Sequence, residues 1–115
     1  MQVKTVKALL SFEALARIHP QAEHYFCPDR ECQVVYYEAE QTFTVDDVRL
    51  PVFQKDAGPD TLVCYCFGFT RGDVLADAGQ TIPAAIGEHV KAGRCGCDLR
   101  NPQGSCCLGN VKAVS

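Results

Sequence analysis

The sequence lacks a long apolar run, because no stretch approaches the ~18 residues that a membrane span requires. No continuous apolar stretch follows Met1–Lys4, so we expect no secretory signal. The last five residues, 111–115, contain no prenylation box, so we expect no lipid anchor. Together these absences predict a cytoplasmic protein that does not insert into a membrane.

A surplus of positive charge is also missing. The chain has 11 Lys and Arg against 14 Asp and Glu, for a net charge of −3. A nucleic-acid-binding module normally carries a basic face, so we expect no nucleic-acid partner. The sequence also has no Ser/His/Asp constellation, phosphate-binding loop or pair of catalytic carboxylates. These patterns favour an accessory or carrier protein over an enzyme.

Cysteine, in contrast, is abundant, with 8 residues among 115. Without an export signal the thiols are expected to stay reduced, since disulfides are rare in the cytosol. Cysteines in such a protein are interpreted as metal ligands before they are interpreted as disulfides. A disulfide-stapled interaction domain remains the alternative at this point.

The distribution of cysteines predicts two modules. Cysteine is absent from residues 1–26 and 33–63, and a charged Gly-Pro segment at 55–60 has the composition of a linker. We therefore expect modules at 1–57 and 58–115. The second module contains six of the eight cysteines.

The first module is predicted to combine helix and sheet. Apolar residues at helical spacing cover 3–18, with Ser11 as an N-cap where the helix restarts and Pro20 as its end. Stretches rich in β-forming residues then predict short strands, with Pro51 placing the last at an edge. These strands are expected at 33–37, 42–45 and 48–53.

The second module is predicted to be mostly helical. Thr70 opens a helix with a capping-box pattern, and Gly79 ends it. A second helix begins at Thr81 and ends at Gly93, and the segment 95–109 is expected to be mainly loop. The whole chain is thus predicted to be a small α+β protein of two modules stapled by metal.

Three short cysteine motifs flank these two helices. Cys64-Tyr65-Cys66 precedes the first helix, Cys95-Gly96-Cys97 follows the second, and Cys106-Cys107 lies further on. A helix-turn-helix would hold the first two motifs at one end. Thiolates carry negative charge, and helix N-termini and free backbone amides offset it. This arrangement suits an iron–sulfur cluster.

The chain resembles the N-terminal domain of the CopZ copper chaperones, which is related to the bacterioferritin-associated ferredoxin type of [2Fe–2S] domain. The resemblance covers nearly the whole chain and is most specific from residue 64 to residue 111. The matching segments are 26–29, 32–36, 63–70, 91–97 and 101–111.

The resemblance implies a zinc-ribbon-like first module and a helix-turn-helix second module that holds a [2Fe–2S] cluster through four cysteines. The favoured set is Cys64, Cys66, Cys97 and Cys107. Cys95 and Cys106 are the alternates for the last two ligands.

The resemblance also implies zinc at Cys27 and Cys32, with His24 as a third ligand. Structural zinc normally takes four ligands, and the family's additional cysteine knuckle before the first helix has no counterpart here. A lost site or a disulfide therefore remains an alternative. The family's copper-transferring C-x-x-C motif is also absent from this sequence.

We expect a [2Fe–2S] protein for one-electron transfer or redox sensing in copper or heavy-metal homeostasis. The expected partners are a redox or metal-homeostasis protein and copper ions, with Cu(II) reduction suggested by the resemblance alone. The alternative is a module that binds zinc or copper through the same thiols without iron.

Overall fold

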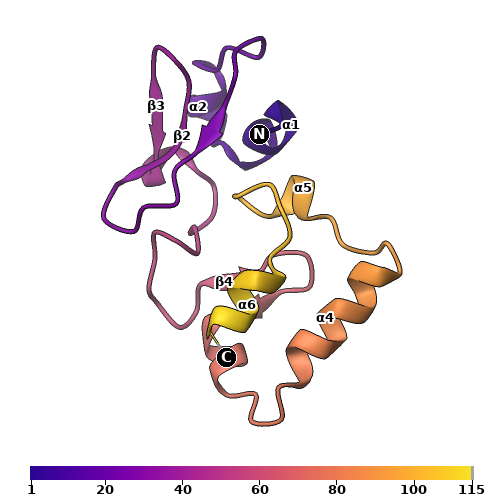
Figure 1. The fold of residues 1–115 in the computed structure, drawn as a ribbon. Coiled ribbons are helices and arrows are strands. Elements are labelled where there is room, and N and C mark those ends of the chain that lie inside the picture. The colour runs from indigo at the N-terminus through magenta and orange to yellow at the C-terminus, as the bar shows by residue number, and fades with distance from the viewer. Residues whose placement is uncertain (115) are drawn as a thin grey trace.

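The computed structural model describes residues 1–114 and confirms the α+β prediction (Figure 1). The helices and strands follow one another as α1 (Val3–Leu9), α2 (Phe12–Leu15), β1 (Tyr25–Phe26), β2 (Val34–Tyr37), β3 (Thr42–Thr44), the 3₁₀ turn η1 (Val45–Asp47), β4 (Leu62–Cys64), β5 (Phe69–Thr70), α3 (Arg71–Leu75), α4 (Thr81–Lys91), α5 (Cys97–Arg100) and α6 (Leu108–Val114).

Residues 1–52, here called the N-terminal lobe, form an antiparallel three-stranded sheet in the order β1-β2-β3 together with α1 and α2. The Ser11 hydroxyl accepts the Ala14 N–H at 3.2 Å, so the predicted cap at the helix restart is confirmed. The lobe has a buried apolar core without cysteine, built from Val6, Leu9, Leu10, Ala14, Val35, Tyr36, Phe43, Val48 and Val52.

The strand predicted at 48–53 is wrong. Only a single bridge forms there, between Leu10 and Val48. Pro51 has no N–H to donate to a sheet, and its carbonyl instead accepts the Tyr65 hydroxyl at 2.6 Å. The segment therefore connects the two halves of the chain.

Residues 53–114, the C-terminal lobe, combine the β4–β5 ribbon with α3, α4, α5 and α6. The capping box at α3 is confirmed: the Thr70 hydroxyl accepts the Asp73 N–H at 3.1 Å, and the Asp73 carboxylate accepts the Thr70 N–H at 3.0 Å. Helix α4 is confirmed too, and Gly93 follows its end with a left-handed φ of 75°.

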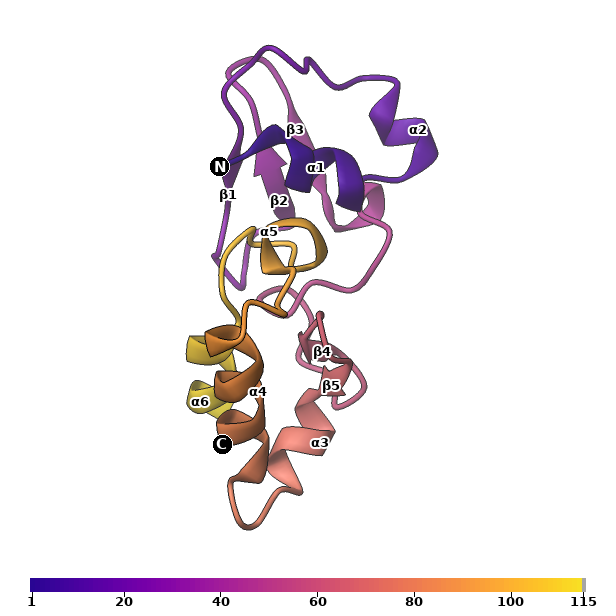
Figure 2. The ribbon, with the colours of Figure 1, turned by 90° about the vertical axis from the view of Figure 1, so that its right-hand side faces the viewer.

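The prediction that 95–109 is mainly loop is only partly right, because α5 lies inside this segment and α6 begins at its end. Figure 2 shows α5 between the two lobes, next to α1. Lys4 forms a 2.8 Å ion pair with Asp98, and the buried Tyr36 hydroxyl donates to the Pro102 carbonyl at 2.5 Å. The segment that carries the last cysteines is therefore attached to the N-terminal lobe.

No helix within residues 1–114 is both long and apolar enough to cross a membrane.

Candidate metal centre

Cys64 and Cys66 lie in the tight turn that joins β4 to β5. Cys64 is the last residue of β4, and the Gly68 N–H returns to its carbonyl at 3.0 Å. Gly68 has a left-handed φ of 79°, which glycine adopts without strain. The turn places both thiols on the side of the ribbon that faces the C-terminal lobe's core.

Cys97 and Cys107 approach this turn from the chain's last segment. Cys97 is the first residue of α5, and Cys107 immediately precedes α6. Both are buried. The Sγ atoms of Cys66 and Cys97 are 3.3 Å apart, and the Cys107 thiol is hydrogen bonded to those of Cys64 and Cys97. The favoured four cysteines are thus connected by a continuous series of sulfur contacts.

The contacts split the proton affinities of these thiols. The hydrogen bond from Cys107 lowers the pKa of Cys64 to about 7 against the effect of burial, and the N–H groups of Phe67 and Cys66 assist. The same bond and burial raise the pKa of Cys107. Burial, with the Cys97 contact, raises the pKa of Cys66 to about 12. Several thiolates together therefore need a positive charge between them.

The alternates Cys95 and Cys106 have a different environment. Cys106 is exposed and Cys95 is half-buried, and neither belongs to the buried core that includes Cys97 and Cys107. Each is next to or near a favoured cysteine in sequence, but the backbone directs the two thiols of a pair to different surroundings. The spacing alone left this choice open.

Backbone and cationic groups surround the four thiols. The Gly96 N–H donates to the Cys66 Sγ at 3.1 Å. The Arg100 guanidinium donates to the Cys66 carbonyl at 3.3 Å, which places a positive charge beside the thiols. Phe67 stacks on His89, with ring centroids 4.7 Å apart, and covers the turn from the α4 side. These groups offset charge on sulfur and limit access of water.

The Cys27–Cys32 loop lies apart, beside β2 in the N-terminal lobe. The Cys27 N–H donates to the Val35 carbonyl at 2.9 Å, and the Cys32 N–H to the Asp29 carbonyl at 3.3 Å. The two half-buried thiols share a hydrogen bond. The Asp29 N–H, that thiol contact and Lys55 lower the pKa of Cys27 despite burial.

Lys55 is a neighbour of this loop that the sequence analysis missed. Its ammonium lies 3.7 Å from the Cys27 Sγ and donates to the Asp29 carbonyl. The two cysteines and the lysine are 28 positions apart or nearly so, and no periodic pattern connects them. Only the folded chain brings them together.

His24 is not brought together with this loop in a ligand group. Its ring is buried, and Nε2 lies 2.8 Å from the Glu38 carboxylate, which also accepts the His19 N–H at 3.0 Å. Its Nδ1 has no hydrogen-bond partner. Across residues 1–114, no three His, Cys, Asp or Glu side chains form a group that could hold a metal ion. A four-ligand zinc site therefore does not fit the described residues.

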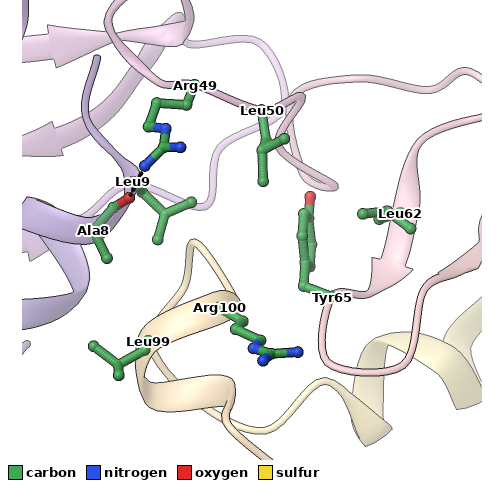
Figure 3. A pocket seen from close by; sticks show the side chains of 8 residues that line it. All are labelled: Ala8, Leu9, Arg49, Leu50, Leu62, Tyr65, Leu99 and Arg100. Atoms are coloured by element: carbon green, nitrogen blue, oxygen red, sulfur yellow. Dashed lines mark hydrogen bonds between the residues drawn. The ribbon is translucent and has the colours of Figure 1, made fainter. Parts of the chain in front are cut away.

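A pocket of about 290 Å³ lies between the lobes (Figure 3). Tyr65, between the two thiols of the ribbon turn, forms part of its wall; its hydroxyl accepts the Phe53 N–H at 3.1 Å. The pocket is lined by Ala8, Leu9, Arg49, Leu50, Leu62, Tyr65, Leu99 and Arg100.

Comparison with known proteins places the N-terminal part in a defined class. Residues 1–49 match the CopZ zinc-binding family, described as "Zinc binding domain". This part of the chain is a CopZ-like zinc-binding domain.

The chain is also homologous to the N-terminal domain of an archaeal copper chaperone. It is 30% identical over 88 residues to the copper chaperone CopZ of Archaeoglobus fulgidus, which spans 76% of this chain and 43% of the chaperone. The X-ray structure of the N-terminal domain of that CopZ superposes with a TM-score of 0.77 at 26% identity. The superposition covers 96% of this chain and 85% of that structure.

Proposed function

We propose that this protein handles metal ions in copper homeostasis. The proposal is supported by the zinc-binding family match and by homology to a copper chaperone, of which this chain spans less than half. The metal-handling groups are thiols, which are the soft ligands that select Cu(I), zinc and iron–sulfur clusters.

We further propose that Cys64, Cys66, Cys97 and Cys107 hold a [2Fe–2S] cluster. The observation that carries this proposal is the series of sulfur contacts, in which Cys64 pairs with Cys107 and Cys66 with Cys97. A [2Fe–2S] cluster takes four cysteine thiolates, two for each iron. The donor set fits, because four thiols meet in one core while no described group suits a single ion.

The surrounding residues would tune such a site. When bound, the cluster supplies a one-electron redox couple. The Gly96 N–H stabilises negative charge on the Cys66 sulfur, and the Arg100 guanidinium adds a positive charge nearby. Burial of Cys64 and Cys107 excludes water from one side of the thiols. Hydrogen bonding, charge and burial are the properties by which a protein sets the potential of its cluster.

The alternative is that the same thiols bind zinc or copper without iron. The comparisons favour it directly, since the family description names zinc and the relative is a copper chaperone. The two candidates differ in colour: a [2Fe–2S] protein absorbs visible light, and a zinc or Cu(I) thiolate site does not.

The test is metal analysis and visible spectroscopy of the full chain purified without oxygen. We expect iron and visible absorption, both lost in Cys97→Ser and Cys107→Ser. The neighbouring variants Cys95→Ser and Cys106→Ser serve as matched controls and should keep both signals. Equal loss in all four variants would refute the ligand assignment. Colourless protein with zinc or copper in place of iron would support the alternative.

A further inference from the structure

We propose that Cys27 and Cys32 form a two-coordinate Cu(I) site, with the Lys55 ammonium as its counter-charge. This inference rests on the copper-handling part of the proposed function and is independent of the iron–sulfur proposal. It concerns a different lobe and different thiols.

The two sulfur donors are already in contact and their loop is fixed. The thiols share a hydrogen bond, and the loop is closed by backbone bonds to Val35 and Asp29. The Glu31 N–H also donates to the Asp29 carboxylate at 2.9 Å. Both thiols are half-buried, so an ion has access from solvent while part of its surface is covered. A metal that needs only two ligands would require little rearrangement here.

The number of donors selects the metal. Structural zinc takes four ligands in a tetrahedron, and no third His, Cys, Asp or Glu within residues 1–114 completes such a set. Cu(I) prefers soft thiolates and is stable with two of them in a linear arrangement. A pair of thiols therefore satisfies Cu(I) and leaves zinc with half of its ligands missing.

The charge of the neighbouring group points to the same ion. A Cu(I) ion with two thiolates carries a net charge of −1, whereas Zn(II) with two thiolates is neutral. The Lys55 ammonium lies 3.7 Å from the Cys27 sulfur and is anchored to the Asp29 carbonyl. A fixed cation at this distance stabilises an anionic complex and gives a neutral one no comparable benefit. Binding releases the two thiol protons and changes no oxidation state.

The experiment is a titration of the full chain with Cu(I) under anaerobic, reducing conditions, in competition with the chromophoric chelator bicinchoninate. The variant Cys27→Ser/Cys32→Ser should bind one Cu(I) fewer per chain than the wild type. Lys55→Met should retain that ion with roughly tenfold weaker affinity, and Lys55→Arg should restore most of the loss. Lys7→Met, an exposed lysine on α1, is the matched control and should leave the affinity unchanged.

Iron is counted in the same samples, so the two proposals can fail separately. Loss of one Cu(I) in the double variant with iron unchanged supports this site. An unchanged Cu(I) count in that variant overturns it, and so does equal affinity in Lys55→Met. Titration with Zn(II) alone and light scattering complete the test: zinc bound more tightly than Cu(I) at these thiols, or a metal-bridged dimer, would also overturn it.

Discussion

The two lobes of the molecule keep their thiols in opposite places. The core of the N-terminal lobe contains no cysteine, and Cys27 and Cys32 lie in a half-buried loop beside it. In the C-terminal lobe, Cys64, Cys97 and Cys107 are themselves buried members of the core. An apolar core stabilises its lobe without metal, whereas a core centred on thiols depends on what binds them. The two lobes should therefore respond differently to metal removal.

The largest expected effect is the loss of the C-terminal lobe's order when metal is removed. Without it, four polarisable thiols share a small core, and metal binding contributes directly to folding in such sites. We expect backbone amides in 62–114 to exchange at least a hundredfold faster in the apo protein. Amides in 3–48 should change less than tenfold. Hydrogen exchange with mass spectrometry of the native and chelated protein makes the measurement.

Equal acceleration in both segments would show that the lobes fold as one unit. Unchanged exchange in 62–114 would show that the C-terminal core is stable on its apolar residues alone.

A large cavity in the N-terminal lobe tests the other side of the comparison. Phe43 is fully buried, and Phe43→Ala should cost about 3–5 kcal/mol of unfolding free energy. The iron content should remain as in the wild type, because the thiols lie in the other lobe. Urea denaturation followed by circular dichroism gives the stability, and metal analysis gives the iron. Loss of iron in the folded variant would contradict the separation of the lobes.

The contact between the lobes can be weakened by one atom. Tyr36→Phe removes the hydroxyl that donates to the Pro102 carbonyl and leaves that buried acceptor unpaired. The expected cost is about 1–2 kcal/mol. Because Pro102 lies between Cys97 and Cys107, exchange should accelerate most in this segment. A uniform change across the chain would assign the loss to the N-terminal core alone.

The smallest expected effect is acid sensitivity centred on Glu38. Burial raises the pKa of this carboxyl, but hydrogen bonds from the His19 N–H, Gln41, His24 and the His19 ring outweigh burial and lower it to about 2 from 4.5. The folded state therefore holds the proton less tightly than the unfolded state. Its contribution to stability is present above pH 4.5 and is lost as the pH falls toward 2.

Glu38→Gln should remove this dependence. The unfolding free energy of the wild type should fall more steeply between pH 4.5 and 2 than that of the variant, in chemical denaturation at each pH. Parallel curves would show that Glu38 does not carry the acid sensitivity.

Local signals in the sequence were sufficient for part of this structure. Ser11, Thr70 and Gly93 act on neighbouring backbone groups, so the caps and ends of their helices could be predicted from a few residues. The alternating residues of β2 and β3 similarly marked a hairpin. These features depend on interactions within about four residues.

Other features depend on tertiary packing. The short α5 is held by contacts of Asp98 with Lys4 and Thr5 of α1, more than 90 positions away. The β4–β5 ribbon has only a few residues per strand and no clear alternation. Packing also decides that Cys97 is in the core while Cys95 is half-buried. The spacing of the motifs proposed which thiols meet, but not which charged groups accompany them.

The central claim is that four thiols of the C-terminal lobe hold two bridged irons. Its most direct test is the amount of iron and acid-labile sulfide per chain in protein isolated and reconstituted without oxygen, with an EPR spectrum after reduction. The account predicts two irons and two sulfides per chain and a signal from a single unpaired electron. Protein that remains colourless and free of iron and sulfide after reconstitution would contradict it.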